Sequence, residues 1–297
     1  MEILNGIARM QQNVYFDTNS FREIGKALEN TALGDDLREH ILVSPLSALE
    51  VLSQLSITKG DEVLRQIQSI RNWINPKRAA LLPWPDDVLA NIGFGKPMKD
   101  DEFTQRIEKV VNVCLDATSA QTLQEDAGKL KDKMDVMKSK TAEEFGRLLD
   151  AARKKSPKGD WFPEAWFQGI VKRVKADPRS RSVADLIKTF SAYYEFERVK
   201  LETALQQDDY NVEKRQNDLL DAEQLIYLSS PELYFLTCDK GFARVNKSPQ
   251  SARIKIVSAK DISDVHGVEA LLRRTTGVAT NAAAVQPAVQ SFQDDRE

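Results

Sequence analysis

The stretch Val14-Tyr15-Phe16-Asp17-Thr18-Asn19 joins an apolar triplet to an aspartate near the start of the chain. Three consecutive bulky, β-favouring side chains predict a buried strand at residues 14–16. The residues that follow, 21–30, are predicted to be helical. We therefore expect a strand that leads through Asp17 into a helix.

The same arrangement returns toward the other end of the chain. Leu233–Thr237 is predicted to be a second apolar strand, and it ends at Cys238-Asp239-Lys240-Gly241. A third strand is expected at residues 254–257. Helices are predicted at residues 44–55, where Ser44 and Pro45 suit the first positions, and at 61–73, 218–228 and 268–273. Strands separated by helices indicate a parallel sheet built by right-handed crossovers.

The middle of the chain has a different character. Residues 100–207 are almost purely helical in pattern, with breaks near residues 156–159 and at Asp177-Pro178. We expect one α/β domain assembled from both ends of the chain, with residues 1–95 as its first part and 211–274 as its second. Residues 96–210 are then a helical insertion, and residues 275–297 a disordered tail.

Composition narrows the classes of protein. The chain has 297 residues, of which 41% are hydrophobic and 29% charged, with a net charge of −3. These values are typical of a soluble globular protein. Residues 1–12 lack the pattern of a signal peptide, and no apolar run is long enough to span a membrane. We expect a cytoplasmic protein without a membrane partner.

Several catalytic chemistries are excluded by the scarcity of cysteine and histidine. The two cysteines, Cys114 and Cys238, match no metal-ligand spacing, and neither histidine lies near a nucleophile elbow. A zinc ribbon and a serine triad are therefore not expected. Carboxylates or amides must carry most of the chemistry.

Five acidic residues occupy suggestive positions. Asp17 and Asp239 follow strands of the predicted parallel sheet, and ligands of such sheets bind beyond the carboxyl ends of the strands. Asp218 and Asp221 begin a helix at i, i+3 spacing, and Glu50 has apolar neighbours on its helix. Taken singly, these acids also suit a helix cap, a helix dipole, a turn or a solvent-facing position.

Their joint occurrence favours a metal site. Carboxylates that are packed together repel one another, and a divalent cation among them offsets that repulsion. Oxygen ligands without histidine or cysteine indicate Mg²⁺ or Mn²⁺.

Four segments, in this order, resemble the PIN-domain nuclease family. They are Val14–Asn19, Ser47–Leu52, Asn217–Leu225 and Phe235–Phe242. The resemblance covers roughly residues 10–95 and 210–273. It implies an α/β fold, a three-layer PIN-like (Rossmann-like) domain with a central parallel sheet, here interrupted by the long all-helical insertion.

The resemblance also implies a site and an activity. Catalytic metal ligands would be Asp17, Glu50, Asp239 and one or both of Asp218 and Asp221, and three further polar residues would orient the acids: Thr18, Asn19 and Thr237. The activity would be a Mg²⁺- or Mn²⁺-dependent endonuclease that hydrolyses phosphodiester bonds in single-stranded RNA. Such hydrolysis needs no covalent enzyme intermediate.

Positive charge is concentrated in the helical middle. Residues 127–200 contain 18 Lys and Arg against 11 Asp and Glu, a net charge of +7, so the rest of the chain carries −10. The basic residues expected to bind nucleic acid are Lys154, Lys155, Lys158, Lys172, Arg173 and Lys175. The aromatic residues between them, Trp161, Phe162, Trp166 and Phe167, suit stacking on single-stranded bases. The same pattern also fits a solvated helix face over an aromatic core, or a surface for a regulatory protein partner.

Other functions stay open at this point. A nuclease of the same fold acting on DNA or on a particular nucleic-acid structure is one alternative, and a catalytically inactive PIN-like binding or scaffold module is another. A haloacid-dehalogenase-like phosphatase is disfavoured, because that family has an Asp-x-Asp motif at its first strand and Asn19 stands here in place of the second aspartate. The sequence leaves a homo-oligomer open.

Overall fold

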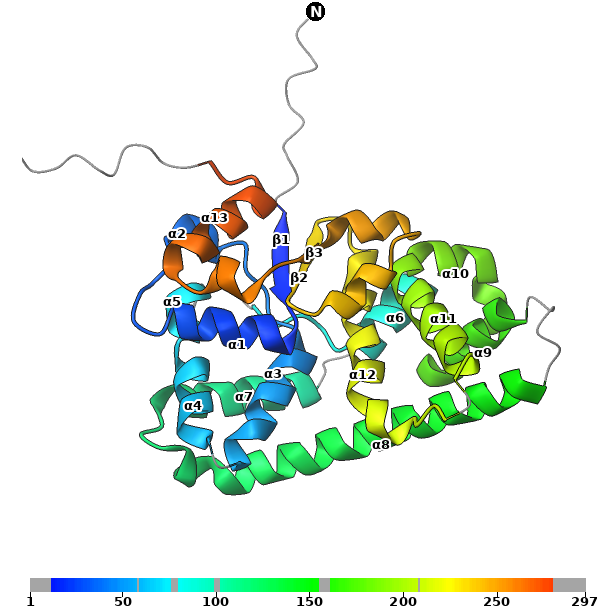
Figure 1. Cartoon of the computed structure of the whole chain (residues 1–297), viewed down its shortest axis with the longest axis horizontal. Helices are drawn as coiled ribbons and strands as arrows, with labels where there is room; N and C mark the ends of the chain where they lie inside the picture. Colours follow the sequence, from blue (N-terminus) through cyan, green and yellow to red (C-terminus); the bar gives the residue numbers. More distant parts are fainter. Residues whose placement is uncertain are drawn as a thin grey trace, which may run out of the picture.

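The sheet of the computed structural model is parallel and lies at the centre of the molecule (Figure 1). The structure describes residues 12–57, 59–75, 80–98, 102–154, 161–207 and 209–279. Its strands are β1 (Asn13–Phe16), β2 (Leu233–Thr237) and β3 (Ile254–Ile256), in the spatial order β1-β2-β3. The three predicted strands are confirmed within one residue at each end. Although they lie far apart in sequence, β1 and β2 are direct neighbours, with Phe16 opposite Leu236.

Two short segments extend the sheet beyond β1. Single parallel bridges join Val14 to Ile41 and Val43 to Leu81. Each is supported by backbone hydrogen bonds, such as Leu42 N to the Val14 carbonyl at 2.8 Å and Leu82 N to the Val43 carbonyl at 2.9 Å. The spatial order of the extended sheet is therefore residue 81, residues 41–43, β1, β2 and β3. From β1 toward one edge of the sheet each segment comes later in the chain, and the same holds from β2 toward the other edge. The strand order therefore reverses at the β1–β2 pair.

The α-helices of the described chain account for most of its residues. The helices between β1 and the helical middle are α1 (Thr18–Ala27), α2 (Asp35–Arg38), α3 (Pro45–Ser53), α4 (Gly60–Gln68), α5 (Ile70–Trp73) and α6 (Pro85–Phe94). The helical middle and the return to the sheet contain α7 (Glu102–Asp116), α8 (Gln124–Lys154), α9 (Phe162–Val174), α10 (Val183–Thr189), α11 (Ser191–Leu205), α12 (Gln216–Gln224) and α13 (Val265–Thr276). Short 3₁₀ helices connect them, among them η5 (Leu225–Ser229) and η6 (Lys240–Arg244).

Helices cover both faces of the sheet, because both faces of the strands are apolar. Val14 and Phe16 belong to one hydrophobic cluster with α1, α3, α4 and α13, while Tyr15 belongs to a second cluster with α9, α11 and α12. Alternate residues of a strand point to opposite faces, so a continuous apolar run is buried on both sides. The α/β class is confirmed.

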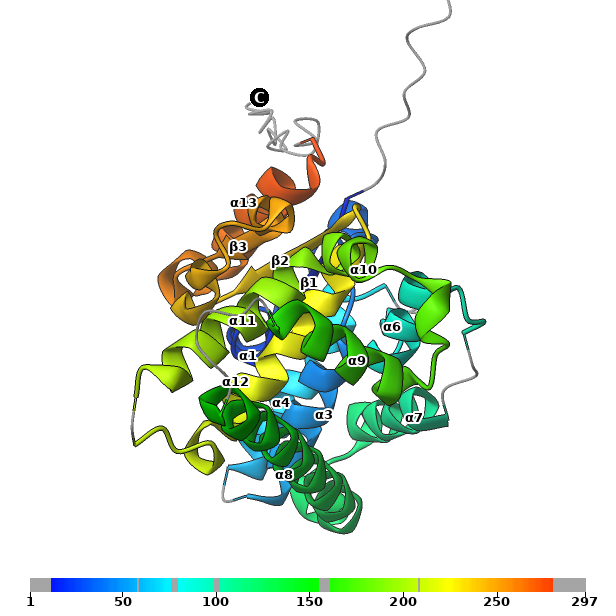
Figure 2. The same cartoon turned by 90° about the vertical axis from the view of Figure 1, so that its right-hand side faces the viewer.

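The helical middle is packed into the same two clusters. α8 runs along one side of the molecule and contacts both α3 and α12 (Figures 1 and 2). Its first half contributes Leu130 and Met134 to one cluster, and its second half contributes Phe145 and Leu149 to the other. Residues 100–207 are mostly helical where they are described, and the break expected at Asp177-Pro178 is confirmed between α9 and α10. The break expected at residues 156–159 lies outside the described residues.

The predicted start of the tail is wrong. Thr275 and Thr276 form the buried last turn of α13, where their hydroxyls donate to the carbonyls of Leu271 and Leu272 at 2.8 Å each. The helix ends at Gly277, whose φ of 74° is a left-handed conformation that glycine adopts without strain. Residues 280–297 lie outside the described part of the chain.

Cys114 and Cys238 are both free thiols. None of the helices in the described ranges is both long enough and apolar enough to cross a bilayer.

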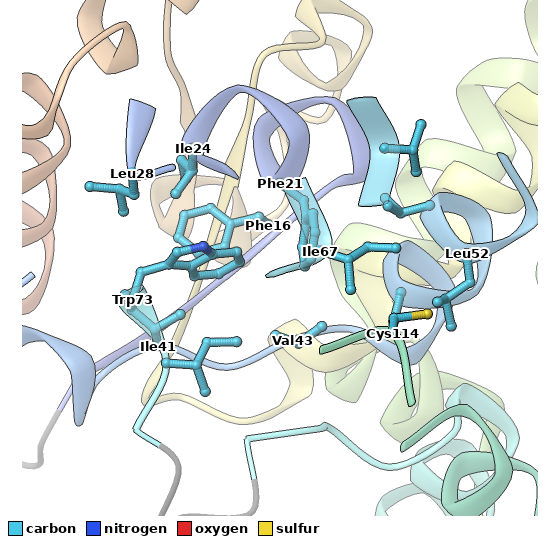
Figure 3. Close-up of a cluster of buried hydrophobic side chains, with 14 of the residues drawn as sticks. Phe16, Phe21, Ile24, Leu28, Ile41, Val43, Leu52, Ile67, Trp73 and Cys114 are labelled. Carbon is cyan, nitrogen blue, oxygen red and sulfur yellow. The ribbon is translucent and has the colours of Figure 1, made fainter. Parts of the chain in front are cut away.

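Trp73 is central to the cluster that supports β1 (Figure 3). It is fully buried and lies edge-on to Phe16 and Phe21, with ring centroids 6.0 and 5.0 Å away. Its indole N–H donates to Ser69 Oγ at 3.1 Å. Trp73 thus joins α5 to the strand that ends at Asp17.

Replacing Trp73 by alanine should therefore lower the free energy of unfolding by about 3–5 kcal/mol, because a large cavity replaces the ring and the Ser69 hydroxyl loses the indole donor, although it still donates to the Gln66 carbonyl. Urea denaturation measures this loss. Val136→Ala is the control, since Val136 is 67% exposed, and it should change stability by less than about 0.5 kcal/mol. Equal stability of the two variants would contradict the packing described.

Candidate active site

Two of the predicted acids lie where the sheet order reverses. Asp17 directly follows β1, and Asp239 is the second residue after the end of β2. β1 and β2 are neighbours, and chain order runs outward from this pair in both directions. Open parallel sheets bind ligands at such a reversal, beyond the carboxyl ends of the strands.

Asp17 is held in place from two sides. It caps α1, where its Oδ1 accepts the Ser20 N–H at 2.9 Å, and its Oδ2 accepts the Thr237 hydroxyl at 2.8 Å. Burial raises the pKa of Asp17, the hydrogen bonds from Ser20 and Thr237 oppose this shift, and the charge of Asp239 adds to it. Asp17 is thus an oriented acid in a place that disfavours its charge.

Asp239 is tied to Asp17 through one threonine. Its backbone N–H donates to Thr237 Oγ1 at 2.9 Å, so the hydroxyl that donates to Asp17 also fixes the Asp239 backbone. Asp239 Oδ1 accepts the Gly241 N–H at 2.7 Å. A Cβ at position 241 would lie 3.1 Å from that oxygen, so glycine permits the close turn. Among the described residues, Asp239 Oδ2 accepts no hydrogen bond.

Glu50 reaches the same place from α3. Thr18 Oγ1 donates to its Oε2 at 2.6 Å, which links α3 to the first turn of α1. Its Oε1 lies 4.0 Å from the Lys138 ammonium and accepts no hydrogen bond from the described residues. Thr18 and Thr237 therefore orient acids, whereas Asn19 lies exposed on the first turn of α1.

Asp221 brings α12 to these acids. Burial and the negative charges of Glu50, Asp17 and Asp239 raise the pKa of Asp221 to about 8, while the positive charge of Lys200 opposes the shift. The four residues Asp17, Glu50, Asp221 and Asp239 are called the acid cluster below. Asp218 lies one turn earlier on α12, and its side chain lies outside the described residues.

A buried hydrogen-bond chain places α3 and α12 side by side. Ser47 Oγ donates to the Phe16 carbonyl at 2.9 Å, and Gln224 Nε2 donates to Ser47 Oγ at 3.0 Å. Ser47 is three residues before Glu50, and Gln224 is three residues after Asp221, so the chain lies one helical turn from each acid. Sequence reasoning did not identify Ser47 and Gln224 as site residues; the only local signal is a polar side chain one turn from each acid.

The donor chemistry of the acid cluster fits a hard dication such as Mg²⁺ or Mn²⁺, because it contains carboxylates and no histidine or thiolate. As the described side chains are positioned, no three Asp, Glu, His or Cys residues form an arrangement able to hold a metal ion. Glu50 Oε1, Asp239 Oδ2 and both carboxylate oxygens of Asp221 accept no hydrogen bond from the described residues and are open for a ligand.

The predicted basic surface is only partly present. Lys154, Lys172 and Lys175 are exposed, and Lys155 and Lys158 lie outside the described residues. Arg173 differs, since its guanidinium forms ion pairs with Asp86 and, at 2.6 Å, with Glu223. These pairs join α9 to α6 and α12. We therefore leave Arg173 out of the surface for nucleic acid.

The expectation that aromatic side chains of this segment stack on bases is wrong for three of them. Phe162, Trp166 and Phe167 are all at least nine-tenths buried in the second hydrophobic cluster. The Trp166 indole N–H donates to Glu197 at 2.7 Å inside the protein. These rings build the core between α9 and α11, and only Trp161 is half-exposed.

Comparisons with family models, with curated proteins and with solved structures give no significant match to the chain. The site is therefore interpreted from its own residues and from the motifs that resemble the PIN-domain family.

Asp221→Asn should change how stability depends on pH. An unfolded aspartate titrates near pH ~4, whereas Asp221 titrates at about 8 in the folded chain. The folded state therefore binds an extra proton between these values, and without divalent cations the free energy of unfolding falls as the pH rises through this window.

Denaturation in chelator at about pH 5 and about pH 8.5 measures this effect. Relative to wild type, Asp221→Asn should gain more than about 1 kcal/mol at the higher pH, about the value of one pKa unit. Asp150→Asn, at an exposed position on α8, should follow wild type. Parallel pH profiles for wild type and Asp221→Asn would contradict the crowding of charges described.

Proposed function

We propose that this chain is a metal-dependent endonuclease of PIN-like type that hydrolyses phosphodiester bonds, with single-stranded RNA as its substrate. The observation that carries the proposal is the acid cluster. Its members come from four separate segments, β1, α3, α12 and β2, and are gathered at the reversal point of the sheet.

Energetics support a ligand for this cluster. Burying Asp221 beside other carboxylates costs free energy, since burial and then the negative charge of Glu50 raise its pKa. The fold nevertheless supports the arrangement with buried polar groups, namely Thr237 on Asp17 and the chain from Gln224 through Ser47 to Phe16. A site built in this way is expected where positive charge is to be bound.

The roles of the residues follow from their contacts. Thr237 and Ser20 fix Asp17, and Thr18 fixes Glu50, so these acids are oriented before any ligand arrives. Glu50 Oε1, Asp239 Oδ2 and the Asp221 carboxylate are the oxygens that would accept a ligand or a proton from water. When bound among these acids, Mg²⁺ or Mn²⁺ supplies charge neutralisation at the phosphate and a lowered pKa for water.

The choice of RNA over DNA rests on the resemblance to the PIN-domain family. The exposed lysines Lys154, Lys172 and Lys175 suit any phosphate backbone. These lysines supply positive charge for a nucleic-acid partner but do not distinguish ribose from deoxyribose. The cleavage assay described below makes that distinction.

A second candidate function is a nucleic-acid-binding module without catalysis. The specific observation in its favour is the 4.0 Å approach of the Lys138 ammonium to Glu50, which supplies positive charge where a cation would otherwise be needed. The absence of a preformed ligand set among the described side chains agrees with it.

A cleavage assay separates these functions. Wild type is incubated with single-stranded RNA, single-stranded DNA and flapped duplex in Mg²⁺ or Mn²⁺. We expect cleavage of RNA that falls at least about 100-fold in Asp17→Asn, because the variant loses a charge that positions the cation.

Asp150→Asn is the matched control and should cleave like wild type. Cleavage that survives Asp17→Asn would remove the proposed site. If wild type binds these substrates and cleaves none of them, the binding module is the correct function; cleavage of DNA alone would correct the substrate.

A further inference from the structure

One lysine lies on the inward face of the long helix α8. The buried residues of this face recur every three or four positions, except between Met134 and Ala142, where the stripe passes through Lys138. The Lys138 side chain is 18% exposed, whereas those of Lys129 and Lys131 are 51% and 47% exposed. The position therefore suits an apolar residue, yet it holds a charge.

α11 repeats this feature. Lys200 is 8% exposed and shares the buried face of α11 with Phe196 and Ala204. Its ammonium lies 5.0 Å from the centre of the Phe196 ring. Lysine is rarely buried to this extent unless another charge compensates for it.

Both lysines approach the acid cluster from the helical middle of the chain. α8 packs against α3 and α12, the two helices that carry Glu50 and Asp221. The Lys138 ammonium lies 4.0 Å from Glu50 Oε1, and the charge of Lys200 acts on Asp221. Lys138 is thus within ion-pair range of Glu50, while Lys200 acts on Asp221 through its charge alone.

Lys138 also retains hydrogen-bonding capacity. A separation of 4.0 Å is within ion-pair range but beyond a hydrogen bond, and the Lys138 ammonium donates none to the described residues. A lysine ammonium has three donors and commonly binds phosphate oxygens as a point charge.

A polyanion must approach four carboxylates to react at this site. The exposed lysines on α8 and α9 attract its backbone but lie on the outer surface, so the repulsion at the cluster itself needs positive charge nearby. Lys138 lies within ion-pair range of one member of the cluster, and the charge of Lys200 acts on another.

We propose that Lys138 binds the phosphodiester group of the nucleic acid beside the acid cluster, with the buried charge of Lys200 adding to the attraction, so that the helical middle forms part of the active site. The inference rests on the proposed function for the identity of the ligand. It goes further in assigning a substrate-binding residue that lies outside the motifs resembling the PIN-domain family.

Binding measured without catalysis tests this proposal. Fluorescence anisotropy of a labelled single-stranded RNA oligonucleotide is recorded in excess EDTA, so that cleavage does not contribute. Lys138→Met should weaken binding about tenfold and lower the salt dependence by about one phosphate contact, and Lys200→Met should weaken binding through the lost charge without removing a phosphate contact. Lys140→Met is the matched control, because Lys140 lies on the exposed face of α8, and it should weaken binding less than about twofold.

If a single substitution unfolds the chain, two variants that preserve the net charge of the site still test the proposal. The double variant Glu50→Gln/Lys138→Met is compared with Glu50→Gln, and Lys200→Arg should restore the binding lost in Lys200→Met. Folding of each variant is checked by circular dichroism.

The outcomes separate this inference from the proposed function. Lysine-dependent binding without any cleavage in Mg²⁺ would retain the phosphate site and remove the nuclease. Cleavage that depends on Asp17, together with equal binding by Lys138→Met, Lys200→Met and Lys140→Met, would overturn the phosphate site alone.

Discussion

Electrostatic repulsion among Asp17, Glu50, Asp221 and Asp239 is the constraint around which the rest of the molecule is arranged. These acids meet because β1 and β2 are buried neighbours and because Ser47 and Gln224 join α3 to α12 beneath them. Burial raises the pKa of Asp221 to about 8, and the negative charges of Glu50, Asp17 and Asp239 add to that shift. Folding must therefore supply enough apolar packing, such as that around Trp73, to hold like charges together.

The elements predicted correctly from the sequence are those whose residue pattern has a single structural interpretation. β1 and β2 are continuous apolar runs, which parallel strands buried on both faces require. Residues 41–43 and 81 were not predicted to join the sheet, because one or two ladder bonds between helices leave no periodicity. Gln224 and Ser47 are 177 residues apart, so no local pattern announces their hydrogen bond. The side chains around Trp166 were misinterpreted for a related reason, since spacing shows that a face exists and not what covers it.

The helical middle is part of the folded core and not only an attachment to the parallel sheet. α8 contributes to both hydrophobic clusters and crosses the helices that carry Glu50 and Asp221. Its charge follows the same division, with exposed lysines outward and Lys138 inward. The same helix thus packs into both clusters and carries the lysine that approaches Glu50.

Divalent-cation binding tests the account most directly, because it concerns the cluster before any substrate is added. Calorimetric titration of the wild-type chain with Mn²⁺ should show saturable binding, which is lost or weakened more than about tenfold in Asp239→Asn and unchanged in Asp150→Asn. Absence of Mn²⁺ binding in wild type, or equal binding by Asp239→Asn, would contradict the claim that these acids are gathered for a cation.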